Sequence, residues 1–214
     1  EDVIVVVDWK SCHVQLHRHN DGKLLATSDR LESEPRGVCL INVMEICVIL
    51  KDSRIEIMSI QCTGDTGVIT QIRTLDVNTL FYECHGVAYM NSIDKAVVCG
   101  YKRGTISWCI VSLGDGYVDT VHQICRGGLS DSDSYLTTRK NMIYISCCAG
   151  ADSPENGLHA YDIHNHSKQK FIYKNHDLKS PRGISVDTMG FIFVCNWGDP
   201  PSIYHLTDSG ELMS

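Results

Sequence analysis

A short segment built around a glycine recurs at a regular interval along the chain. Pro181–Val186 reads Pro-Arg-Gly-Ile-Ser-Val, Pro35–Leu40 reads Pro-Arg-Gly-Val-Cys-Leu, and Cys84–Tyr89 is a looser copy. The glycines of these copies are at positions 37, 86 and 183, so the first interval is 49 residues and the second is close to two such intervals. A fourth copy is therefore expected at Ser134–Thr137.

Each copy is followed, after a turn, by an apolar run typical of a buried strand. The runs are Glu45–Leu50, Lys95–Cys99, Met142–Cys147 and Phe191–Cys195, and Val3–Val7 is an earlier one without a preceding glycine segment. A repeat of about 40 to 50 residues made of short strands is the sequence signature of a propeller blade. We therefore predict an all-β fold, a β-propeller of four-stranded antiparallel blades.

The repeat predicts a single propeller domain over residues 1–214, with blades at approximately 1–30, 31–78, 79–128, 129–177 and 178–214. The first blade lacks its inner strand, and the last one stops where a fourth strand is expected. Because an open sheet edge presents unpaired backbone groups, a ring of blades has to close. We therefore expect these five blades to belong to a six-bladed ring in a longer chain. A five-bladed ring closed by the two ends of this chain is the alternative.

Charge and hydropathy limit the partners. The chain has 26 acidic and 19 basic residues, a formal net charge of −7, which opposes general attraction to nucleic-acid phosphates. No run of 18 apolar residues is present, so a membrane partner is not expected.

The eleven cysteines follow the repeat rather than a disulfide pattern. Cys99, Cys147 and Cys195 are 48 residues apart and end three of the apolar runs. Cysteine at such a position is expected to be a small apolar filler between blades. Thiols placed in this way favour a reducing compartment, and we predict a cytoplasmic protein.

Four residues occupy equivalent positions at the start of the inner strands: Arg36, His85, Tyr135 and Arg182. If the blades are arranged radially, they meet at one mouth of the central channel. The arginines could receive a phosphate or carboxylate, and His85 and Tyr135 could stack on a ring. The alternative interpretation is that the arginines are solvated loop residues whose stems pack on their neighbours.

The segment Pro181–Gly198, Pro-Arg-Gly-Ile-Ser-Val-Asp-Thr-Met-Gly-Phe-Ile-Phe-Val-Cys-Asn-Trp-Gly, resembles the NHL repeat, whose copies read approximately Pro-x-Gly-Ile-x-Val-Asp-x-x-Gly-x-Ile-x-Val-Ala-Asp. Pro35–Lys51 matches more weakly, and the other copies keep only the strand phase. As a whole the chain is similar to the C-terminal propellers of tripartite-motif (TRIM) proteins, especially divergent invertebrate ones.

This resemblance implies a propeller that selects the protein substrate of a ubiquitin ligase. The family places a RING finger, B-boxes and a coiled coil before the propeller. The chain contains no Cys-x-x-Cys pair, so ligase activity, and any oligomerisation through a coiled coil, would belong to sequence outside it. We therefore predict a protein partner and no enzymatic activity in this chain.

Two alternatives stay open. The first is an RNA-binding NHL propeller, although the basic residues are scattered and their main group, Lys168, Lys170, Lys174 and Lys179, lies around an outer strand where lysines protect the sheet edge. The second is a metal-dependent hydrolase, because the segment ending in Asn196-Trp197-Gly198 also looks like six-bladed lactonases.

The lactonase alternative needs several inward oxygen ligands for a divalent metal. Asp8 and Asn196 occupy matching positions, but the third and fourth blades hold glycine and cysteine there, so we predict no metal or other cofactor. His13, His17 and His19 share one face of an outer strand and are expected to face solvent. No nucleophile elbow, phosphate loop or His-Glu-x-x-His motif is present.

Overall fold

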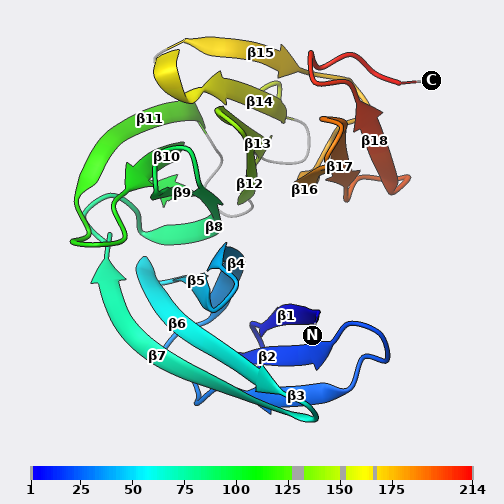
Figure 1. Cartoon of the computed structure of the whole chain (residues 1–214). Helices are drawn as coiled ribbons and strands as arrows, with labels where there is room; N and C mark the ends of the chain where they lie inside the picture. The colour runs from blue at the N-terminus through cyan, green and yellow to red at the C-terminus, as the bar shows by residue number, and fades with distance from the viewer. Residues whose placement is uncertain (1, 127–132, 150–152, 166–167, 214) are drawn as a thin grey trace.

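The regular secondary structure of the described chain is almost entirely β-strand (Figure 1). The computed structural model describes residues 2–126, 133–149, 153–165 and 168–213. Within these ranges the chain forms eighteen strands in five antiparallel sheets and one 3-10 helix, η1 (Ile163–Asn165). None of its helices is long or apolar enough to cross a membrane.

The three middle sheets have four strands each, joined in sequence order from the inside of the molecule to the outside. They are β4 (Pro35–Asn42), β5 (Glu45–Leu50), β6 (Arg54–Thr63) and β7 (Thr66–Asp76); β8 (Glu83–Met90), β9 (Lys95–Lys102), β10 (Thr105–Val111) and β11 (Val118–Arg126); and β12 (Asp133–Arg139), β13 (Met142–Cys148), β14 (Gly157–Asp162) and β15 (Gln169–Tyr173).

The first and last sheets have three strands each among the described residues. They are β1 (Val3–Asp8), β2 (His13–Arg18) and β3 (Leu24–Thr27), and β16 (Pro181–Val186), β17 (Ile192–Asn196) and β18 (Ser202–Leu206).

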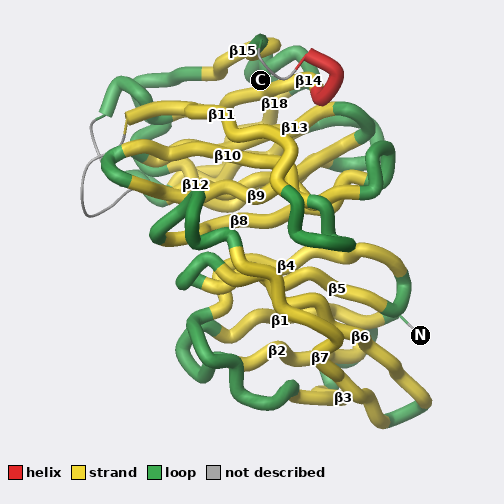
Figure 2. Tube along the Cα trace, turned by 90° about the vertical axis from the view of Figure 1, so that its left-hand side faces the viewer, coloured by secondary structure: helices red, strands yellow, loops and turns green. Residues whose placement is uncertain are grey.

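The five sheets stand around a common axis as the blades of a propeller, in sequence order from blade 1 to blade 5 (Figures 1 and 2). The inner strands β4, β8, β12 and β16 contact one another in turn. The predicted all-β propeller of small antiparallel sheets is therefore confirmed, with five blades. The blades form an arc, and blades 1 and 5 lie at its two ends.

Strand β1 is the innermost described strand of its blade and pairs with β2, but it occupies the place that the second strand holds in the middle blades. It contacts the inner strand of the next blade, β4, in the way that β5 contacts β8 and β13 contacts β16. Its outward face is open, because Ile4 is 44% exposed and Val6 39% exposed.

Apolar layers between successive blades form the core. Buried residues of one blade pack on those of the next, as the alternation along each strand requires. Representative members of the four layers, from blades 1 and 2 to blades 4 and 5, are Leu16 and Ile46, Ile55 and Val87, Trp108 and Ile143, and Leu158 and Val194.

The repeated glycines let the inner strands approach each other. A Cβ atom on Gly86 would lie 3.2 Å from the backbone nitrogen of Leu136 in blade 4, and one on Gly37 would lie 3.4 Å from the Cα of Gly86. Gly183, the equivalent residue of blade 5, has no atom within 4 Å of such a Cβ. The first two glycines are packed against a following blade, and the third is not.

Two expectations about the cysteines were wrong. Cys195 is exposed rather than buried, because no blade in the described part of the chain packs against its face of β17. Cys147 is fully buried, but it forms a disulfide with Cys125, which links β13 to β11 across the interface of blades 3 and 4. Cys99 is a buried free thiol, as the repeat predicted.

Candidate functional site

We refer to the four predicted site residues, Arg36, His85, Tyr135 and Arg182, as the inner-strand cluster. Three of them stand at β-bulges. Around Arg36 the pairing of β4 with β5 skips one residue, around His85 the pairing of β8 with β9 does the same, and Arg182 lies in the register shift of β16. Tyr135 pairs regularly with Ser146. A bulge redirects side chains and is frequent beside functional sites.

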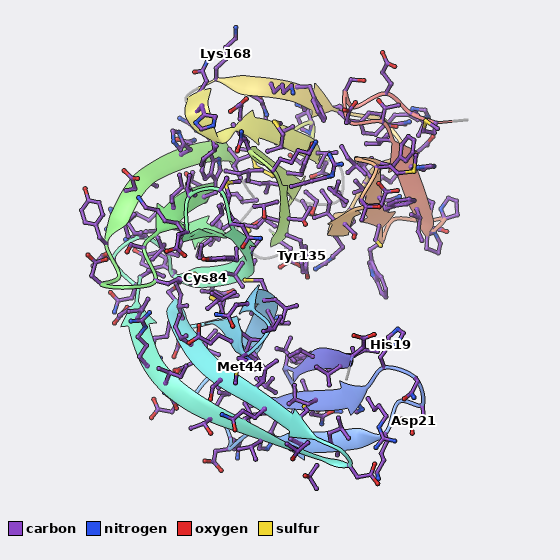
Figure 3. All side chains as sticks on the ribbon, viewed as in Figure 1. His19, Asp21, Met44, Cys84, Tyr135 and Lys168 are labelled. Carbon is purple, nitrogen blue, oxygen red and sulfur yellow. A yellow bond between two sulfur atoms is a disulfide. The ribbon has the colours of Figure 1, made fainter. Side chains whose placement is uncertain are left out.

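The structure brings the four residues together from four blades. Burial lowers the pKa of His85 to about 4; Glu83 raises it, and the guanidinium groups of Arg36 and Arg182 lower it. Burial also raises the pKa of Tyr135, and Arg36 opposes that rise. Arg36 and Arg182 come from blades 2 and 5. Because the charges of both lower the pKa of His85, both guanidinium groups lie near this ring. Figure 3 shows Tyr135 on the inner side of the arc and Lys168 on its outer side.

His85 is less available than the sequence suggested. It is 6% exposed, and its Nδ1 accepts a hydrogen bond of 3.2 Å from the backbone N–H of Ser134 in blade 4. An accepting Nδ1 and the low pKa make the ring neutral, with its proton on Nε2. His85 therefore joins two blades, and Tyr135, Arg36 and Arg182 are the members of the cluster that remain partly exposed.

Carboxylates accompany the cluster, which the sequence reasoning missed. Glu34 lies 2.9 Å from the guanidinium of Arg36, Asp133 pairs with Arg182, and an oxygen of Glu83 lies 3.9 Å from Nε2 of His85. Each acid stands two residues before the cluster member of its own blade: Glu34, Glu83 and Asp133. That recurring spacing was the available signal. Lys51, 3.7 Å from Glu34, adds one more positive charge.

The pairing makes the cluster a set of balanced charges. Both arginines already have a carboxylate partner, and the ion pairs are partly exposed, with side-chain exposures of 27 to 36%. A phosphate would have to compete with Glu34 and Asp133 for the guanidinium groups. The geometry therefore suits a partner of mixed charge better than a polyanion.

Exposed aromatic residues stand at the same end of the strands. Trp9 directly follows β1 and is 58% exposed, Trp197 directly follows β17 and is 77% exposed, and Tyr82 directly precedes β8 and is 55% exposed. In an antiparallel blade the inner strand begins beside the end of the second strand, as the pairing of Pro181 with Asn196 shows. These three side chains and the inner-strand cluster therefore share one end of the propeller, which we call the cluster face.

Asp8 and Asn196, the residues considered as metal ligands, form hydrogen bonds with the backbone of neighbouring turns and loops. The Oδ1 of Asn196 accepts hydrogen bonds from the backbone N–H groups of Ser180 (3.0 Å) and Gly198 (3.3 Å), and its Nδ2 donates to the carbonyl of Asp177 (2.8 Å). Asp8 accepts from the backbone of the turn that follows β1. No group of three or more His, Cys, Asp or Glu residues suited to a metal occurs in the described ranges.

The histidines of the first blade are also engaged locally. The Nδ1 of His13 lies 2.9 Å from the carbonyl of Ser28, and that of His17 lies 3.1 Å from the carbonyl of Gly22. These contacts tie the two rings to neighbouring loops of their own blade.

Comparison with known proteins identifies the fold. The chain is similar to a chain of a nidogen/laminin complex (TM-score 0.72, 12% identity, covering 99% of this chain and 74% of that one). It is similar to U3-55K (TM-score 0.69, 11% identity, covering 98% and 59%) and to the WD40 repeats of RRP9 (TM-score 0.67, 12% identity, covering 98% and 58%).

The shared feature is the propeller. At identities of 11 to 12% these likenesses show the fold alone. The chain spans less than two thirds of the U3-55K and RRP9 chains. No protein-family model matches the sequence, and no curated protein does.

Proposed function

We propose that this propeller is a protein-recognition module and that the cluster face is its binding surface. The observation that carries the proposal is the grouping of Trp9, Tyr82 and Trp197 with Arg36 and Arg182 at one end of the blades. Aromatic residues and arginine are enriched in protein interfaces and dominate their binding energy. Exposed large apolar side chains that gather on one face of a protein mark interaction sites.

The charge pattern supports a protein rather than a nucleic acid as partner. The net charge is −7, and the arginines of the cluster are paired with Glu34 and Asp133. A partner that offers both an acid and a base can exchange ion pairs with this surface, which favours specificity. The similarity to a chain of a complex between nidogen and laminin shows that a propeller of this shape occurs in a protein assembly.

The test compares two ends of the same molecule. Trp9→Ala with Trp197→Ala removes aromatic anchors from the cluster face. Val43→Ala with Met189→Ala removes residues that are 91% and 76% exposed in turns at the opposite end. In quantitative affinity capture followed by mass spectrometry, the amount of a specific partner that is captured should fall at least about tenfold with the first pair of substitutions. It should be unchanged with the second pair.

Equal loss of every captured protein with both pairs would contradict the proposal. A filter-binding assay with random-sequence RNA at physiological salt tests the RNA-binding alternative. Binding of RNA by the wild type that is lost in the double variant Arg36→Ala with Arg182→Ala would favour that alternative over protein recognition. Far-UV circular dichroism of all variants establishes that they are folded.

We also infer that the recognised protein is the substrate of a TRIM-like ubiquitin ligase, an inference that rests on the resemblance of Pro181–Gly198 to the NHL repeat. Fusion of this propeller to a RING and coiled coil should then promote ubiquitination of the captured partner. Absence of ubiquitination, with capture intact, would leave the recognition module and remove the ligase context.

We infer as well that a sixth blade closes the ring between blades 5 and 1. Its support is the open face of blade 1 at Ile4 and Val6, the exposed Ile203 of blade 5, and the empty space beside Gly183. In a longer polypeptide, the amides of β1 should exchange with deuterium much more slowly than in residues 1–214 alone. Equal exchange would contradict ring closure.

A further inference from the structure

A cavity of about 450 Å³ lies between the outer strands of blades 1 and 2. One wall is the connection that follows β3, at Ser28 to Glu32, and the other is formed by β6 and β7. Its apolar lining comes from Leu31, Met58 and Ile69, which belong to the core layer between these two blades. The cavity is thus set into the blade interface.

A buried carboxylate lines this cavity. Glu56 on β6 is 4% exposed and shares its face of the strand with Met58 and Ile60, so it occupies a position where the alternation calls for an apolar residue. Burial raises the pKa of Glu56. Placing a carboxylate in such a site is costly unless a counter-charge or several hydrogen bonds compensate it.

The chain supplies only part of that compensation. The Thr74 hydroxyl donates to Oε2 of Glu56 over 2.9 Å, and the Gln71 amide donates to Thr74 over 2.9 Å. The guanidinium of Arg54, which lines the same cavity, donates instead to Asp52 and Glu32. No ion pair joins Glu56 to a basic residue within the described part of the chain.

The lining favours a small cation with an apolar stem. Three carboxylates line the cavity, Asp29, Glu32 and Glu56, against two guanidinium groups, Arg30 and Arg54. Thr74 occupies one oxygen of Glu56, which disfavours a guanidinium that binds both oxygens of a carboxylate side by side. An ammonium group is compact and uses single acceptors, and an alkyl stem would lie along Met58 and Ile69.

We propose that this cavity is a binding site for a primary alkylammonium group, such as the side chain of a lysine, with Glu56 as its counter-ion. The cavity lies at the same end of the propeller as the inner-strand cluster, but between the outer strands of blades 1 and 2, and its existence does not depend on the proposed function.

The probes are n-butylammonium chloride and n-butanol, which have the same carbon chain and differ in charge. In methyl NMR of the 214-residue protein, n-butylammonium should shift the Met58 methyl resonance saturably, and n-butanol at equal concentration should not. Glu56→Gln should lower the affinity for n-butylammonium at least about tenfold, which is the loss expected when a buried charge partner is removed. Glu45→Gln, at the first residue of β5 and at the other end of the same blade, should bind like the wild type.

Three results would overturn the proposal: no shift with n-butylammonium, an equal shift with n-butanol, or unchanged binding in Glu56→Gln. Tighter binding of methylguanidinium than of n-butylammonium would also overturn it, in favour of a guanidinium site. The comparison of the two butyl probes on the wild-type protein stands even if Glu56→Gln does not fold.

Discussion

The backbone N–H of Ser134 donates a hydrogen bond to Nδ1 of His85, and the two residues are 49 positions apart. The same separation recurs where Thr138 donates to the carbonyl of Tyr89 (2.8 Å) and where Arg139 donates to the carbonyl of Thr188 (2.6 Å). The length of the repeat is therefore also the length of chain between residues that are bonded across a blade interface. Equivalent positions of successive blades hold each other in place.

Acid is expected to destabilise the fold through His85 and His159. Both rings are buried, and burial lowers the pKa of each to about 4, whereas an unfolded histidine titrates near about 6.5. Between these values the unfolded chain binds more protons than the folded one. The free energy of unfolding is thus at its full value above about pH 6.5 and falls as the pH drops towards 4, by up to about 3 kcal/mol per histidine.

Urea unfolding at about pH 7 and about pH 5 measures this loss. His85→Gln keeps an acceptor for Ser134 and removes the titrating group, so the loss between the two pH values should become clearly smaller than in the wild type. An unchanged loss in His85→Gln would rule out His85 as a source of acid sensitivity.

Two glycines of the repeat should respond differently to the same substitution. In Gly86→Ala the new Cβ would stand 3.1 Å from Sγ of Cys99 and 3.2 Å from the backbone of Leu136, so the inner strands must move apart. We expect a loss of about 1–3 kcal/mol in the free energy of unfolding. Gly183→Ala meets nothing within 4 Å and should change stability by less than about 0.5 kcal/mol. Equal effects in urea titrations would contradict the packing described at β8 and β12.

The connection between blades 2 and 3 offers a pair of adjacent aromatic residues. Phe81 is 1% exposed and belongs to the core layer between these blades, whereas Tyr82 is 55% exposed. Phe81→Ala should lower the free energy of unfolding by about 3–5 kcal/mol because it leaves a cavity. Tyr82→Ala should lower it by less than about 1 kcal/mol and serves as the control. A stable Phe81→Ala protein would show that this connection does not anchor the blades.

The disulfide between Cys125 and Cys147 predicts a count of reactive thiols. Of the eleven cysteines, nine are free. Maleimide labelling under denaturing, non-reducing conditions should therefore modify nine residues by intact mass, and all eleven after reduction. Eleven labels without reductant would show that the pair is not formed, which would agree with the reducing, cytoplasmic location that the sequence pattern predicted.

Much of the site could be found from the sequence, because its members follow the repeat. The glycine segments at 37, 86 and 183 placed Arg36, His85 and Arg182 in phase. The burial of His85 could not be found in this way, because it depends on Ser134 approaching from the next blade. The pairing of Asp133 with Arg182 likewise joins residues that are 49 positions apart and meet only when the blades are arranged radially.

The sequence by itself determined the unit: a strand opened by a glycine, a buried strand in fixed phase, and a period of 49 residues. These features are local, because alternation and turn residues act over a few positions of the chain. Only the tertiary structure decided which faces are covered. Cys99 and Cys195 occupy the same position of the repeat, yet one is buried by a following blade and the other is exposed at the end of the arc. Whether a side chain is buried depends on the blade that packs against it, and the local sequence of one repeat does not specify that blade.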